Sequence, residues 1–97
     1  MKILAIIDVV PGADVAAVRS RLDEELRASW QLFAAGKLRE AYGTATPTRV
    51  IFVLEAESVG EARAELERMP LVAEQLFCVE LVELRPFTNW SLLFAKT

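Results

Sequence analysis

The stretch KILAIIDVV, residues 2–10, decides the fold because it predicts a strand that is apolar on both faces. An apolar, partly β-branched run of this length that stops at Pro11-Gly12 is typical of a β-strand. One parity of the run holds Ile3, Ala5 and Ile7, and the other holds Leu4 and Ile6. Because alternate side chains of a strand point to opposite faces of a sheet, we expect this sheet to be covered on both sides.

The next two segments predict a long helix and a hairpin. Apolar residues recur every three or four positions from residue 15 to 33, which predicts a helix with one buried face that ends at Gly36. Residues 37–45 and 49–55 are extended runs around a short turn with a proline, as in a β-hairpin. The helix stripe that we expect to be buried consists of Val15, Val18, Leu22, Leu26, Trp30 and Phe33.

The second half of the chain repeats the order of helix and strand. Ser58 and Glu61 match a capping box and predict the start of a second helix, which Pro70 should end. Residues 76–84 predict a fourth strand, and residues 87–97 a short helix whose aromatic residues should dock over a pocket mouth or on a partner. The buried stripe expected in the second helix consists of Val59, Ala62, Leu66 and Met69.

This β-α-β-β-α-β order predicts an α+β, ferredoxin-like fold with a four-stranded antiparallel sheet and two helices on one face. The helices can cover only that face. The apolar residues on the other face therefore predict a homodimer in which two sheets pack against each other.

The composition narrows the chemistry. The 97 residues, 54% of them hydrophobic, suffice for one folded domain. The chain has no histidine, which excludes Ser-His-Asp and Cys-His catalysis. Its single cysteine, Cys78, allows no intramolecular disulfide and no CxxC motif, and we expect it to be a buried core thiol. With no glycine-rich phosphate loop either, we expect neither a metal nor another cofactor.

Charge and hydropathy exclude other partners. The net charge is −3 and the chain lacks a basic stripe, so we expect no nucleic-acid binding. No apolar run is long enough to cross a membrane, and no targeting segment is visible, so we expect a cytoplasmic protein.

Four stretches of the sequence resemble one known family. They are WQLFAAGK at 30–37, VLEAES at 53–58, MPL at 69–71 and FCVELVEL at 77–84. Together with the element order they resemble the muconolactone isomerase-like proteins of the dimeric α/β barrel superfamily. The resemblance implies one domain over residues 1–97, a homodimer that can assemble further, and a cofactor-independent isomerase. Such an enzyme would act by proton transfer on a small unsaturated or aromatic carboxylated compound.

Three residues are candidates for the proton transfer. Glu80 is surrounded in sequence by apolar residues, where a carboxylate is costly unless it is paired or functional, and it is the first candidate for a general base. Its alternative role is a salt bridge to an arginine of the partner. Glu40 and Tyr42 lie two residues apart on a strand and so share a sheet face, where they can act as acid or base and as hydroxyl donor. Alternatively, they protect an edge strand by its charge.

Four residues are candidates for substrate binding. Arg39 and Arg49 can bind a carboxylate through paired hydrogen bonds, or form surface ion pairs. Trp30 and Phe33 can form an aromatic wall for a flat ligand between the first helix and the sheet, or pack in the core. The alternative function is a small-ligand-binding or regulatory, ACT-like dimeric module without catalysis. An RNA-recognition domain is disfavoured because Phe52 is the only aromatic residue on the first and third predicted strands.

Overall fold

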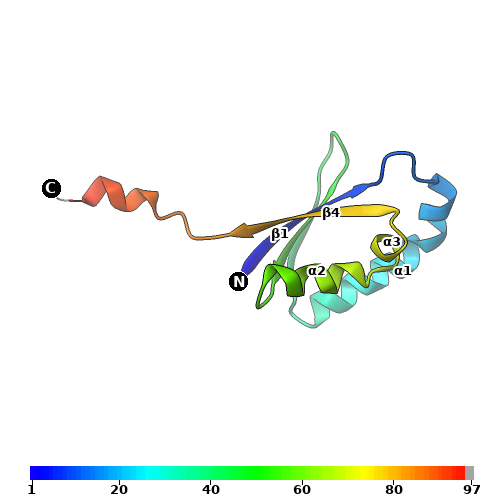
Figure 1. Cartoon of the computed structure of the whole chain (residues 1–97), viewed down its shortest axis with the longest axis horizontal. Helices are drawn as coiled ribbons and strands as arrows, with labels where there is room; N and C mark the ends of the chain where they lie inside the picture. The colour runs from blue at the N-terminus through cyan, green and yellow to red at the C-terminus, as the bar shows by residue number, and fades with distance from the viewer. Residues whose placement is uncertain (96–97) are drawn as a thin grey trace.

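A computed structural model describes residues 1–95 and confirms the predicted order of elements (Figure 1). Two short helices, α3 and η1, accompany the six main elements. The elements are β1 (Lys2–Val9), α1 (Val15–Ala34), β2 (Leu38–Gly43), β3 (Val50–Glu55), α2 (Val59–Glu67), α3 (Pro70–Ala73), β4 (Phe77–Leu84) and the 3-10 helix η1 (Asn89–Phe94).

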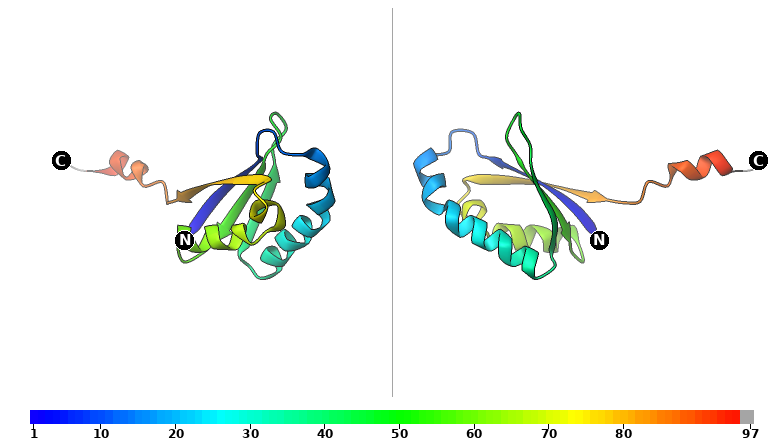
Figure 2. Two further views of the ribbon diagram at one scale, coloured as in Figure 1. Left: turned by 45° about the vertical axis from the view of Figure 1, so that its right-hand side comes forward. Right: turned by 180° about the vertical axis from the view of Figure 1, so that it is seen from behind.

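The four strands form one antiparallel sheet in the order β2-β3-β1-β4. β1 is central, and its Ile3 lies opposite Leu54 of β3 and Glu83 of β4. The three α-helices lie on one side of this sheet, and the other side is open in the single chain (Figure 2). This is the ferredoxin-like architecture that the sequence predicted.

The core lies between this helical layer and the sheet. Ile3, Leu66 and Leu71 are fully buried there, and Ala5, Ile7, Phe52 and Leu54 pack around them from β1 and β3. The expected stripe of α2 is confirmed, because Ala62, Leu66 and Met69 are buried and Val59 packs against them. Pro70 lies just beyond α2, as expected, but it also begins α3, a position that suits a residue without an amide hydrogen.

The prediction that the apolar stripe of α1 is buried is wrong for the single chain. Leu22, Leu26, Trp30 and Phe33 are between 42% and 66% exposed. The residues of α1 that pack toward the core are Ala28 and Leu32, while Glu25 is the one buried residue of the helix. The face of α1 that packs on the core is therefore the one that carries Glu25, Ala28 and Leu32, so the helix is rotated about its axis relative to the prediction.

The open face of the sheet carries both apolar and charged side chains. Leu4 and Ile6 on β1 lie beside Ile51 and Val53 on β3, with Val82 on β4. Cys78 lies on this face, opposite Asp8, and is exposed, which corrects the expectation of a buried thiol. The reason is its parity on β4, which points it away from the helices.

The C-terminal segment leaves the domain after β4 and extends away from it (Figure 1). Its 3-10 helix η1 holds Trp90 against Phe87 in an edge-to-face contact with ring centroids 4.8 Å apart. Both side chains are more than half exposed, as is Phe94. Residues 96 and 97 of the predicted segment lie outside the described residues. Within residues 1–95, no helix combines the length and the apolar character that crossing a membrane would require.

Candidate functional site

A cleft of about 580 Å³ lies between the C-terminal half of α1 and the edge strand β2. Trp30 and Phe33 form one wall, and their rings stack with centroids 5.4 Å apart and an interplanar angle of 27°. Both rings are exposed because α1 is rotated. An exposed pair of stacked aromatic rings beside a cleft is suited to binding a flat, apolar ligand.

Arg39 supplies positive charge at this cleft. It follows the turn at Gly36, whose φ of +78° lies in the left-handed region, and its Nε donates a 2.7 Å hydrogen bond to the Gly36 carbonyl. The ladder between β2 and β3 is irregular at this residue, between Leu38 and Glu40. The guanidinium forms no ion pair with any residue from 1 to 95, so its terminal nitrogens can bind an anion.

Glu40 and Tyr42 complete the cleft from β2. They lie opposite Val53 and Ile51, so their side chains project toward the open face. The Tyr42 hydroxyl donates a 2.5 Å hydrogen bond to Oε1 of Glu40, and this bond to a carboxylate raises the pKa of Tyr42 above its ordinary value of 10.0. Because β2 is an edge strand, this pair lies at the rim, between the cleft and the open face.

The structure places the other two candidates away from this cleft. Glu80 is exposed on β4, opposite Ile6, and forms no ion pair with any described residue. The sheet order puts β4 three strands from β2, about 14 Å at the usual strand spacing. Arg49 pairs with Asp8 at 3.3 Å, which is the surface ion pair that the sequence left open as its alternative role.

One carboxylate that the sequence reasoning missed is buried under α1. Glu25 is 6% exposed, and its Oε1 accepts a 2.8 Å hydrogen bond from the Leu71 amide of α3. Burial raises the pKa of Glu25 above its ordinary value of 4.5, although the hydrogen bond from Leu71 opposes this shift. The sequence held one signal for this burial, because Glu25 lies on the same helical face as Ala28 and Leu32. A glutamate in a helix rich in charged residues is usually exposed to solvent, so the signal was weak.

We expect the burial of Glu25 to make stability depend on pH. A raised pKa means that the folded protein binds this proton more tightly than the unfolded chain does. The stability that the bound proton adds is therefore fully present at pH values below the pKa of Glu25 in the unfolded chain. It is lost as the pH rises through the folded pKa. Chemical denaturation of the wild type and Glu25→Gln across this range should therefore show the wild type losing stability relative to the variant with rising pH. A constant difference between the two proteins would contradict the raised pKa.

The described residues offer no metal site built from side chains. Among residues 1–95, no group of three or more histidine, cysteine, aspartate or glutamate side chains is arranged to hold a metal ion. The polar residues that β2 contributes to the lining of the cleft are Arg39, Glu40 and Tyr42.

Solved structures of two enzymes share this fold. Muconolactone isomerase matches 91% of this chain and 93% of its own, with a TM-score of 0.73 and 20% identity. The 5-chloro-2-hydroxyhydroquinone dehydrochlorinase of Burkholderia phenoliruptrix AC1100, in complex with 2,5-dihydroxybenzoquinone, matches 92% of this chain and 98% of its own, with a TM-score of 0.64 and 20% identity. No family model and no curated relative matches the chain. At this identity the likeness establishes the shared fold, and the function depends on the site.

Proposed function

We propose that the protein is a cofactor-independent isomerase that transfers a proton on a small unsaturated or aromatic carboxylated compound. The observation that carries the proposal is the cleft that holds an aromatic stack and a guanidinium without an ion pair, with the hydrogen-bonded Glu40–Tyr42 pair at its rim. The shared fold with an isomerase and a dehydrochlorinase supports an enzyme that acts on a small molecule.

Each side chain of the cleft has a part in this proposal. The ring or unsaturated chain of the substrate would lie against Trp30 and Phe33, and its carboxylate would bind the guanidinium of Arg39. These contacts would hold the reacting carbon near the carboxylate of Glu40. Positioning of this kind removes much of the entropic barrier to a proton transfer.

The proton transfer balances without an oxidant or a cofactor. The Glu40 carboxylate would accept a proton from a carbon next to the conjugated system, and the electron pair of the broken C–H bond would move into that system. Once Glu40 has taken the proton, the Tyr42 hydroxyl, which its raised pKa keeps protonated, would release its hydrogen bond to Glu40 and donate to the oxygen that gains charge. Return of the proton from Glu40 to a different carbon completes the double-bond shift.

We further propose that the open sheet face forms a homodimer. Leu4, Ile6 and Val82 would then be buried against a second copy, which explains why both faces of the central strand are apolar. Glu80 would lie between the two sheets, where it remains a second candidate for the base or a partner for an arginine of the other copy. A cytoplasmic location and the lack of nucleic-acid and membrane partners stay predictions.

The C-terminal segment has a natural place in such a dimer. Phe87, Trp90 and Phe94 are exposed on a segment that extends away from its own domain (Figure 1). Exposed aromatic side chains in this number are costly in water, so we propose that the segment docks on a second copy.

Fluorescence and turnover test the proposed function. The chain has two tryptophans, so Trp90→Phe leaves Trp30 as the only indole. Muconolactone and 2,5-dihydroxybenzoquinone should change the emission of Trp90→Phe, whereas the matched variant Trp30→Phe should respond little. If muconolactone is turned over, Glu40→Gln should lower the rate by about 100-fold or more, the usual size of a general-base contribution. Glu67→Gln, an exposed change on α2, is the control and should keep the full rate.

The outcomes separate the two candidate functions. Binding at Trp30 without turnover of any unsaturated acid would support the small-ligand-binding or regulatory module instead of an enzyme. A Glu40→Gln variant with an unchanged rate would exclude Glu40 as the base, and Glu80→Gln would then be the next variant to assay.

A further inference from the structure

A second, more enclosed pocket lies behind the cleft, between α1 and the sheet. Its volume is about 380 Å³. It continues the outer cleft, because both are lined by the same five residues: Leu26, Ser29, Ala41, Tyr42 and Phe52. Glu25 contributes the only acidic side chain to its lining, and no lysine or arginine contributes to it. The inner pocket is therefore an apolar chamber with a single carboxyl group.

We propose that this inner pocket is a binding site for an uncharged ring that bears a carbonyl or hydroxyl oxygen, and that the protonated carboxyl of Glu25 donates a hydrogen bond to this oxygen. The proposal deepens the proposed function and rests on it in one respect: the same ligand would extend outward, with its carboxylate at Arg39. The inner pocket can nevertheless be tested alone, with a ring that has no carboxylate.

The geometry leaves one oxygen of Glu25 available. Its Oε1 accepts the amide hydrogen of Leu71, and this is the only hydrogen bond that the side chain makes with residues 1–95. Within the same residues, no buried side-chain oxygen or nitrogen lacks a hydrogen-bond partner. The second oxygen of Glu25 is thus not sealed in the core, and Glu25 is a lining residue of the inner pocket.

The bond to Leu71 also has a structural role. The helix α3 has no side-chain cap at its first residues, and Glu25 satisfies one of the amides there. A glutamine can accept the same amide hydrogen through its carbonyl oxygen and present its NH₂ group to the pocket. The substitution Glu25→Gln therefore separates the structural role, which it keeps, from the titration, which it removes.

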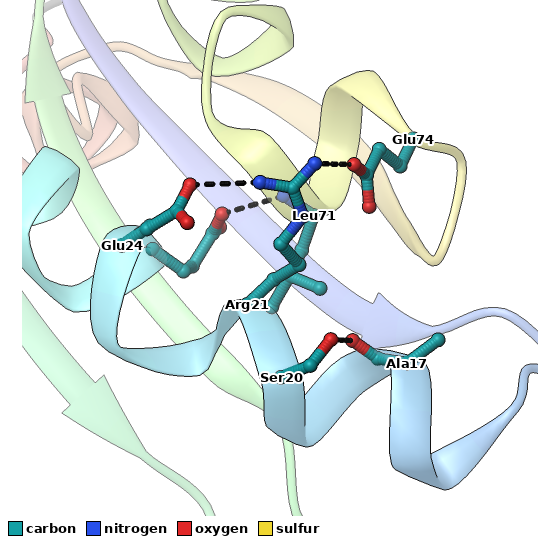
Figure 3. A network of polar contacts seen from close by, with 7 residues as sticks. Ala17, Ser20, Arg21, Glu24, Leu71 and Glu74 are labelled. Atoms are coloured by element: carbon teal, nitrogen blue, oxygen red, sulfur yellow. Dashed lines mark hydrogen bonds and ion pairs between the residues drawn. The ribbon is translucent and has the colours of Figure 1, made fainter.

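Burial favours the protonated form of Glu25, and no ion pair with a described residue opposes it. Arg21, one turn earlier on α1, is held by Glu24 and by Glu74 at the end of α3 (Figure 3). It forms no ion pair with Glu25, whose pKa is raised by burial. Tyr42 is the other titratable residue of the lining, and its raised pKa keeps it neutral. An ionised carboxylate could only accept hydrogen bonds, so binding of a carbonyl oxygen should require the Glu25 proton.

Two probes of the same shape test this inference. Acetophenone has a carbonyl oxygen, and isopropylbenzene replaces that oxygen with a methyl group. The quantity to compare is the affinity for acetophenone divided by the affinity for isopropylbenzene, measured by calorimetry or ligand-observed NMR. For the wild type we expect this ratio to fall by about fivefold or more as the pH rises from about 5 to about 9. In Glu25→Gln the ratio should be constant, because an amide donates at every pH. The control Glu24→Gln, one residue away and exposed, should keep the wild-type profile.

Each outcome decides the inference, and none depends on turnover. A falling ratio in the wild type that becomes constant in Glu25→Gln supports it. A constant ratio in the wild type, or a falling ratio that persists in Glu25→Gln, overturns it, as does a failure of both probes to bind. In these last cases carboxylate binding at Arg39 and the activity of Glu40 would still stand, so failure of the inner site is distinguishable from failure of the proposed function.

Discussion

Ile6→Glu is expected to abolish the proposed homodimer. Ile6 lies on the central strand, on the open face, between Ile51 and Glu80. Two-fold symmetry would bury two new carboxylates in the interface, and each buried, unpaired ion costs several kcal/mol. The dimer should be weakened by about four orders of magnitude or more. Sedimentation at micromolar concentration should show twice the chain mass for the wild type and no dimer for the variant.

A matched variant and a truncation complete this test. Ala64→Glu adds the same charge at an exposed position of α2 and should leave the dimer intact. Deleting residues 87–97 removes the exposed aromatic segment and should weaken the assembly without unfolding the domain, since none of its described residues is buried. A wild type that is a well-folded monomer at micromolar concentration would defeat the dimer proposal.

Leu66→Ala is expected to destabilise the fold by about 2–5 kcal/mol. Leu66 is 0% exposed in the core between α2 and the sheet, so the truncation leaves a cavity that the surrounding residues cannot fill. Because small domains are stable by only about 5–15 kcal/mol, this is a large part of the total. Equilibrium denaturation in urea should show a lower midpoint with little change in slope.

Leu26→Ala makes the same chemical change on α1 and should cost less than about 1 kcal/mol. Leu26 belongs to the stripe that helical periodicity marks as buried, yet it is 59% exposed. Similar losses for Leu26→Ala and Leu66→Ala would mean that α1 packs through its apolar stripe after all, and would contradict the observed rotation.

The candidate site could be predicted from the sequence only where neighbours in the chain stay neighbours in space. Glu40 and Tyr42 share a face because they are two residues apart on one strand, and Trp30 and Phe33 stack because they are one helical turn apart. Glu80 was predicted to be a candidate base because its neighbours in the sequence are apolar. On a strand, however, those neighbours point to the other face or along the same open face, and the glutamate itself is exposed.

The sequence by itself determined the order of strands and helices, the antiparallel sheet, the buried face of α2 and an apolar second face of the sheet. These features follow from local periodicity, caps and turns, which depend on residues a few positions apart. Only the tertiary structure decided the rotation of α1, the separation of Glu80 from β2 and the burial of Glu25. Each of these depends on contacts between distant segments: α3 packs against α1 and supplies the Leu71 amide that a buried carboxylate needs. Periodicity within a single helix carries no information about such a partner.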